Sequence, residues 1–107
     1  ADLEIADHLT HLEYVSDEDL VHLYSGTEGF ITAATYEANS FTTLEAQATG
    51  APVVIPDVPG MRQMTDDIAI ILPQPTVAEI AEAMRRLATD THLRQSLGQR
   101  QTSRLLL

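Results

Sequence analysis

Short apolar runs alternate along this chain with longer segments in which apolar residues recur at helical spacing. Four of the runs predict strands. The first alternates imperfectly between apolar and polar residues, and the other three are short, apolar and bounded by turn residues, as buried strands are. These runs are residues 9–15, 30–33, 52–55 and 68–72. Helical spacing predicts helices at 16–24, 41–48 and 77–88, and a last helix after Asp90. This order of elements predicts an α/β fold with a short, mainly parallel sheet of about four strands, flanked by helices.

Two of the predicted helices carry capping residues at their starts. Ser16 precedes three acidic residues, which favour the positive end of a helix dipole. Thr76 and Glu79 form a T-x-x-E capping box. In the helix after Thr76, the apolar positions predicted to pack on the core are Val77, Ile80, Ala81, Met84, Leu87 and Ala88.

Length and composition limit the size of the structure. The chain has 107 residues, of which 44% are hydrophobic and 21% charged. This predicts one globular domain over residues 1–107. The longest apolar run, 68–72, is far shorter than the roughly 20 residues of a transmembrane helix. The acidic first residues do not resemble a signal peptide, and without an initiating Met the chain is expected to be a piece of a longer protein.

Acidic side chains dominate the charge. Six Arg residues and no Lys stand against sixteen acids, giving a net charge of −10, and Arg62 is the sole cation of residues 1–67. Such a charge repels phosphate, which argues against binding to nucleic acid or to an anionic membrane. The absence of cysteine excludes a disulfide, a thiolate nucleophile and a Cys-bound zinc. A reducing compartment, the cytoplasm, is therefore expected.

Candidate chemistry lies at one predicted edge of the sheet. Ligands of parallel sheets bind beyond the carboxyl ends of the strands, which here are residues 33–40 and 56–60. Glu37 and Glu45 flank the start of the helix after the second strand. A carboxylate can accept two hydrogen bonds from a vicinal diol, and the free N–H groups at a helix start suit a phosphate. Together they suggest a sugar-nucleotide site, although two glutamates at this spacing also occur as solvated carboxylates.

The same region carries a resemblance to a known family. Residues 36–54 have the sequence Y-E-A-N-S-F-T-T-L-E-A-Q-A-T-G-A-P-V-V. This segment resembles the donor-site segment of retaining GT-B glycosyltransferases of the family-four type, with the pattern Y-E-G-F-G-L-P-x-L-E-A-M-A-x-G-x-P-V-V. Residues 12–24 and 80–94 resemble the flanking elements, so the resemblance covers nearly the whole chain. It implies the latter part of a Rossmann-like nucleotide-sugar-binding domain, with the last four of its six strands.

The resemblance also implies an activity and roles for residues. The enzyme would transfer a sugar from a nucleotide diphosphate donor to an acceptor with retention, and without a metal or other cofactor. Glu37 is the implied catalytic-site residue, in contact with hydroxyls of the transferred sugar, and Glu45 would hold the ribose hydroxyls. The implied donor-binding residues are Ala38, Asn39, Ser40, Phe41, Thr42 and Glu45. The sugar, the base and the acceptor stay open.

The chain departs from the family pattern in its donor loop. The family's Gly-Phe-Gly is Ala38-Asn39-Ser40 here, and its Pro is Thr42. Glycine tolerates positive φ and close backbone approach better than Ala or Ser, which leaves the loop conformation and the donor open. The family's cationic pair for the diphosphate lies upstream of the matched segments. Arg62, on the predicted ligand edge, is either a partial substitute or an ordinary surface arginine.

The family's first two strands and its acceptor-binding domain have no counterpart in the matched segments. The isolated chain is therefore expected to be inactive or nearly so, and to form a homodimer through an exposed sheet edge. Two rival functions stay open: a fragment of a nucleotide-sugar epimerase, and a non-catalytic interaction module with a decayed site. The histidines are interpreted as isolated residues rather than as a metal site; they are His8, His11, His22 and His92.

Overall fold

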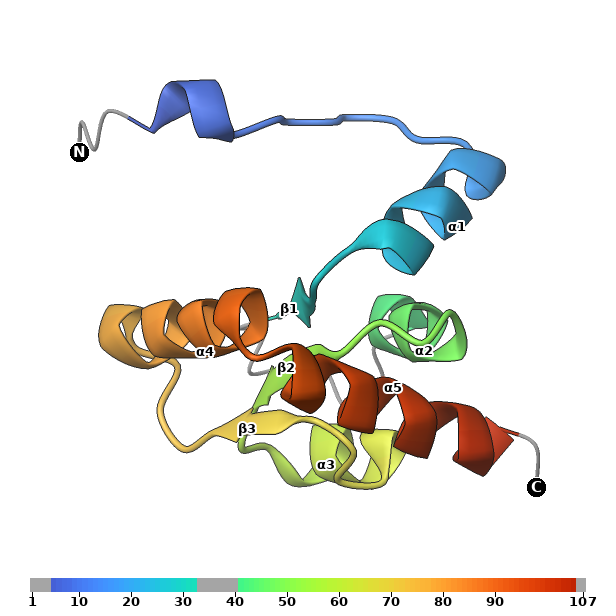
Figure 1. Cartoon of the computed structure of the whole chain (residues 1–107), viewed down its shortest axis with the longest axis vertical. Helices are drawn as coiled ribbons and strands as arrows, with labels where there is room; N and C mark the ends of the chain where they lie inside the picture. Colours follow the sequence, from blue (N-terminus) through green and yellow to red (C-terminus); the bar gives the residue numbers. More distant parts are fainter. Residues whose placement is uncertain (1–4, 33–40, 106–107) are drawn as a thin grey trace.

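The computed structural model of the chain describes residues 5–32 and 41–105 (Figure 1). Within these residues, helices alternate with three short strands. The elements are η1 (Ala6–His8), α1 (Asp17–Gly26), β1 (Phe30–Ile31), α2 (Phe41–Ala48), β2 (Val53–Pro56), α3 (Pro59–Thr65), β3 (Ile70–Leu72), α4 (Val77–Thr89) and α5 (Thr91–Leu105). No helix of the described residues is long and apolar enough to cross a bilayer.

The three strands form one parallel sheet in the order β1-β2-β3, which confirms the α/β class predicted from the sequence. Phe30 lies opposite Val53, and Val54 lies opposite Ile70. Each strand is joined to the next through a helix, as parallel pairing requires. The sheet is a partial Rossmann-like arrangement.

The prediction of about four strands is wrong in one place. Residues 9–15 form no strand in the described structure. In Figure 1 this stretch runs apart from the other elements, joined to them through α1. Leu9, Leu12 and Tyr14 are 68%, 51% and 87% exposed. A strand needs a neighbour to share its backbone hydrogen bonds, and none lies beside this stretch in the described residues.

Alternation along β2 divides the core into two layers. Val53 and Ile55 pack on one side with Tyr24 of α1, Ala46 of α2 and Met61 of α3. Val54 points to the other side, where it packs in a cluster with residues of α4 and α5, namely Ala83, Leu87, Leu93 and Leu97. The sheet therefore lies between α1, α2 and α3 on one face and α4 and α5 on the other.

Both predicted N-cap residues are in place, but the Glu79 half of the predicted capping box binds Gln74 instead of Thr76. The Ser16 hydroxyl accepts a hydrogen bond from the N–H of Asp19 at 3.2 Å. The Thr76 hydroxyl accepts one from the N–H of Glu79, also at 3.2 Å. The Glu79 carboxylate accepts from the N–H of Gln74 at 2.9 Å, so it ties the chain before α4 to its first turn. Each helix start thus has a side-chain acceptor for one of its unpaired N–H groups.

The predicted apolar face of α4 is wrong for part of its length. Ala83 and Leu87 are buried and Ile80 packs beside them, whereas Val77 is 87% and Met84 55% exposed. The buried side chains are three and four residues apart, the spacing of a single helix face. The six predicted positions lie within about 120° of the helix circumference. The buried face is rotated to one side of this arc and includes Ala83, which the spacing alone did not indicate.

A pair of valine substitutions tests this burial pattern. Val54→Ala should lower the free energy of unfolding by about 2–3 kcal/mol, because it removes two fully buried carbons and leaves a cavity. Val77→Ala removes the same atoms from an exposed helix position and should change it by less than about 0.5 kcal/mol. Urea unfolding followed by circular dichroism measures both. Equal losses would contradict the placement of β2 at the centre of the core.

Candidate functional site

The carboxyl ends of the three strands meet at one edge of the sheet. β1 leads into residues 33–40, β2 into Asp57 and β3 into Pro73. The N–H of Asp57 donates to the carbonyl of Leu72 at 2.9 Å, which ties the ends of β2 and β3 together. The edge predicted to carry the ligand is therefore the edge from which these three connections leave.

The structure describes only part of the predicted donor site. Glu37, Ala38, Asn39 and Ser40 lie outside the described residues. Phe41 is the first residue of α2, which begins and ends where the sequence predicted, and Thr42 and Glu45 are exposed on its first two turns. The convergence of Glu37 and Glu45 on one ligand stays a prediction.

Buried side chains fix the position of α2. Thr43, Ala46 and Gln47 are 0–1% exposed. The Gln47 amide donates to the carbonyls of Thr65 at 3.4 Å and of Ile68 at 3.3 Å, on either side of the turn between α3 and β3. Because α2 is held on this face, the opposite face presents Thr42 and Glu45 to solvent. No pattern in the sequence predicts this buried amide.

Glu45 lines a cavity of about 330 Å³ between α1 and α2. Tyr24 and Asp17 of α1 and Thr49 also line it, so carboxylate and hydroxyl groups lie around an apolar wall that includes Leu20. Burial raises the pKa of the Tyr24 phenol, and the negative charge of Glu45 raises it further. A cavity of this kind can accept hydrogen bonds from ligand hydroxyls while an apolar part of the ligand packs on the wall.

Sequence reasoning did not associate Tyr24 with Glu45. The available signal was the spacing of Leu20 and Tyr24, four residues apart on the face of α1 that meets α2. Tyr24 is 9% exposed, and its ring meets Phe30 edge-on at a centroid distance of 5.9 Å. The ring therefore joins the wall of the cavity to the start of β1.

Arg62 is held by two carboxylates. Its Nε donates to Asp67 at 2.9 Å and its NH1 to Asp57 at 3.2 Å. The hydrogen bonds that Arg62 donates, first to Asp67 and then to Asp57, raise the pKa of its guanidinium, which is already always charged. This geometry favours the ordinary surface role over the role of a diphosphate ligand, because both partners already neutralise the cation.

The clamp of Arg62 also holds an unusual turn. Asp66 and Asp67 both have positive φ, 56° and 57°, in the left-handed region. Asp adopts this region more readily than most residues, yet two in succession are uncommon. By binding Asp67 and Asp57 together, Arg62 connects the turn before β3 to the loop that leaves β2. Within residues 5–32 and 41–105, no three His, Asp or Glu side chains gather as metal ligands would.

The neighbourhood of Tyr24 and Glu45 can be tested by titration. Glu45→Gln should lower the pKa of Tyr24 toward, but not down to, its usual value of 10.0, because burial still disfavours the phenolate. In wild type the raised pKa stabilises the fold below pH 10, and this contribution is lost as the pH rises through the higher folded value. Tyrosinate absorbance in a background of Tyr14→Phe and Tyr36→Phe isolates the group.

The matched control for this titration is Glu28→Gln, at an exposed glutamate before β1. It should leave the pKa of Tyr24 unchanged. An equal effect of the two substitutions would show that general charge, rather than the adjacent Glu45, acts on the phenol.

Comparison with known proteins gives a consistent result. The family model described as "Glycosyl transferases group 1" matches residues 1–104. The O-antigen chain mannosyltransferase B of Escherichia coli is 31% identical over 84 residues, covering 78% of this chain and 22% of that protein. The mannosylfructose-phosphate synthase of Agrobacterium fabrum is 36% identical over 53 residues, covering 50% of this chain and 12% of that protein. No solved structure matches significantly.

These matches place the chain within a small part of its relatives, since it spans less than a quarter of either one. The family model covers the segments on which the resemblance to glycosyltransferases rests. The parallel sheet with its flanking helices is the partial Rossmann-like arrangement expected from that resemblance. With the family model matching nearly from end to end, this chain belongs to the group 1 glycosyl transferases.

Proposed function

We propose that the chain is the donor-binding part of a glycosyltransferase that moves a sugar from a nucleotide diphosphate to an acceptor with retention, in the cytoplasm. The observation that carries the proposal is the family match over residues 1–104. The position of α2 supports it, because this helix begins at the ligand edge and presents Glu45 on its second turn. Both relatives are named for mannosyl products, which makes mannose the first sugar to test.

The proposed chemistry depends on placement and charge. The first N–H groups of α2 would face the diphosphate, since a helix start favours an anion. Glu45, exposed beside the cavity between α1 and α2, would accept hydrogen bonds from the ribose hydroxyls. Glu37 would hold hydroxyls of the transferred sugar. Stabilising the departing diphosphate would then provide much of the rate enhancement.

We propose further that the isolated chain does not catalyse transfer. Arg62 is the sole cation of residues 1–67, and its bonds to Asp57 and Asp67 neutralise it. A departing diphosphate would find little positive charge from this part of the chain at the ligand edge. The same observation favours the second candidate, a non-catalytic interaction module. No feature of the described residues favours an epimerase.

Calorimetric titration with UDP, GDP and ADP distinguishes these functions. At least one nucleotide is expected to bind with a sub-millimolar Kd, and Glu45→Ala should weaken it by about 1–3 kcal/mol, the cost of a lost hydrogen bond to a charged group. Glu28→Ala, an exposed glutamate at the other end of the strands, should have no effect. Failure of all three nucleotides to bind would reject a surviving donor site and favour the interaction module.

A homodimer through the sheet edge is also proposed. The N–H groups of Phe30 and Thr32 donate to Pro52 and Val54, so the intervening Ile31 directs its amide to the outer edge of β1. Beside this edge, α1 and β1 form a groove of about 500 Å³ that Leu23 and Phe30 line. The exposed apolar residues of 9–15 supply an extended segment that a second copy could pair there.

Sedimentation equilibrium tests the dimer. Wild type is expected to dimerise at micromolar to millimolar concentration, more tightly at higher salt, because salt screens the repulsion between two chains of net charge −10. Leu12→Glu should weaken the dimer, whereas Val77→Glu, at a more exposed apolar site on α4, should not. A wild-type chain that stays monomeric over this range would refute the proposal.

A further inference from the structure

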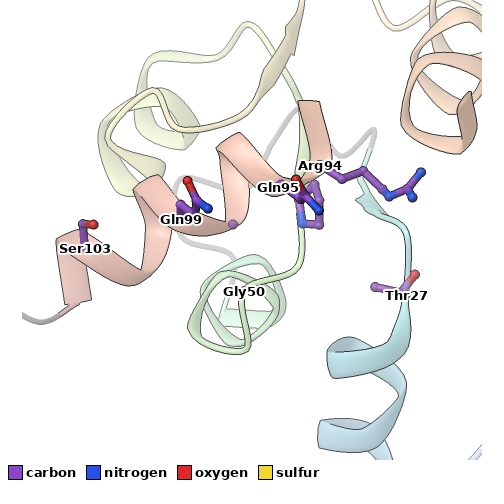
Figure 2. A pocket seen from close by; sticks show the side chains of 8 residues that line it. Thr27, Gly50, Arg94, Gln95, Gln99 and Ser103 are labelled. Carbon is purple, nitrogen blue, oxygen red and sulfur yellow. The ribbon is translucent and has the colours of Figure 1, made fainter. Parts of the chain in front are cut away.

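An open groove lies at the end of the sheet opposite to the proposed donor site. It is a groove of about 840 Å³ between α5 and the segments that lead into β1 and β2 (Figure 2). Thr27 stands before β1, and Gly50 before β2. The groove is therefore at the amino ends of the strands, whereas residues 33–40 and Asp57 leave from the carboxyl ends. The proposed donor site does not use it, and the groove beside the proposed dimer edge shares only Thr27 with it.

Two glycines set the floor of this groove. A Cβ atom on Gly98 would lie 3.2 Å from the carbonyl oxygen of Gly50, which is tighter than most contacts of this kind. Gly98 thus lets α5 lie against the turn after α2, although glycine inside a helix costs about 1 kcal/mol relative to alanine. Gly50 itself has φ +85°, a conformation that side chains rarely adopt. The floor is backbone, with peptide groups in place of side chains.

The wall on α5 consists of polar side chains with free hydrogen-bonding capacity. Gln95 and Gln99 are one helical turn apart, and Ser103 follows one turn later (Figure 2). All three side chains are exposed, and none hydrogen-bonds to another residue of the described part of the chain. A row of amide and hydroxyl groups therefore lines one side of the groove.

Arg94 provides the one charge among the lining residues. Its guanidinium donates to the carbonyl of Leu87 at 2.5 Å and to the Thr91 hydroxyl at 3.3 Å. These bonds use two of its five N–H donors and hold the group in place. Since no carboxylate lines the groove and a single cation does, its chemistry is polar but nearly neutral.

The lining groups determine which ligand fits. Glutamine and serine side chains both donate and accept hydrogen bonds, as the hydroxyls of a sugar do. A multiply charged anion would be matched by several cations, as in phosphate sites, and only Arg94 is present. We infer that this groove is a second carbohydrate site, which binds sugar units of a glycan at a distance from the point of transfer. The choice of a carbohydrate over another hydroxylated ligand rests on the proposed function.

The position of the groove gives this site a distinct role. Because it opens at the amino ends of the strands, sugar units held there are not the units that react at the donor edge. They belong to a longer stretch of acceptor or product glycan, or to a second molecule. No aromatic ring is among the lining residues, so binding is expected to be weak, with a Kd of about 1 mM for a short oligosaccharide.

Amide NMR spectra of the ¹⁵N-labelled chain, titrated with a neutral mannose tetrasaccharide, test this inference. Saturable shifts are expected at the side-chain amides of Gln95 and Gln99 and at the backbone of Gly50 and Gly98. The double variant Gln95→Ala/Gln99→Ala should weaken binding about tenfold, since it removes two neutral hydrogen-bonding groups. The control is Gln63→Ala/Gln74→Ala, two exposed glutamines outside the groove, which should leave the Kd unchanged.

Three results would overturn the inference. The first is the absence of saturable shifts at roughly fifty times the expected Kd. The second is equal binding by wild type and the Gln95→Ala/Gln99→Ala variant. The third is an equal response to inorganic phosphate, which would show recognition of charge at Arg94 rather than of hydroxyls. A failed nucleotide titration would reject the donor site alone, because that experiment reports on Glu45 at the other end of the sheet.

Discussion

Burial of β2 on both faces is the constraint on which the rest of this structure depends. Val53, Val54 and Ile55 are 0–1% exposed, and their side chains alternate between two separate apolar clusters. A strand buried on both sides needs helices on both sides, and its neighbours β1 and β3 must lie parallel to it because each connection passes through a helix. The three connections at the carboxyl ends then leave from one edge. The position of the candidate site is thus a consequence of the packing of β2.

Polar contacts hold the connections around these strands in place. The Gln47 amide reaches across to two carbonyls beyond α3, and Arg62 joins the loop after β2 to the turn before β3. Both contacts hold the connections around the strands rather than the strands themselves. The Gln47 contacts fix α2, and the Arg62 contacts fix the loop after β2. Glu45 meanwhile stays exposed to a ligand.

The sequence predicted those features that local physics determines. The bounds of α2 and the caps of α1 and α4 follow from residue types a few positions apart. Residues 9–15 have the composition of a strand, but pairing depends on a neighbour that local pattern does not reveal. The exposure of Met84 and the two partners of Arg62 likewise depend on tertiary contacts. The glutamate of the candidate site was found from its motif, whereas Tyr24 beside it required the packing of α1 on α2.

The charge at the ligand edge affects nucleotide binding and sugar transfer differently. A helix start contributes the equivalent of about half a positive charge, which is less than the charge of a diphosphate. Asp57 stands in the connection at that edge, whereas Asp66 and Asp67 precede β3 at the amino ends of the strands, and Arg62 bonds to both Asp57 and Asp67. A nucleotide can still bind through its ribose and base. These groups are uncharged, and the ribose hydroxyls can donate hydrogen bonds to the Glu45 carboxylate. Stabilising a leaving diphosphate calls for positive charge, and Arg62, the sole cation of residues 1–67, is already paired with two carboxylates.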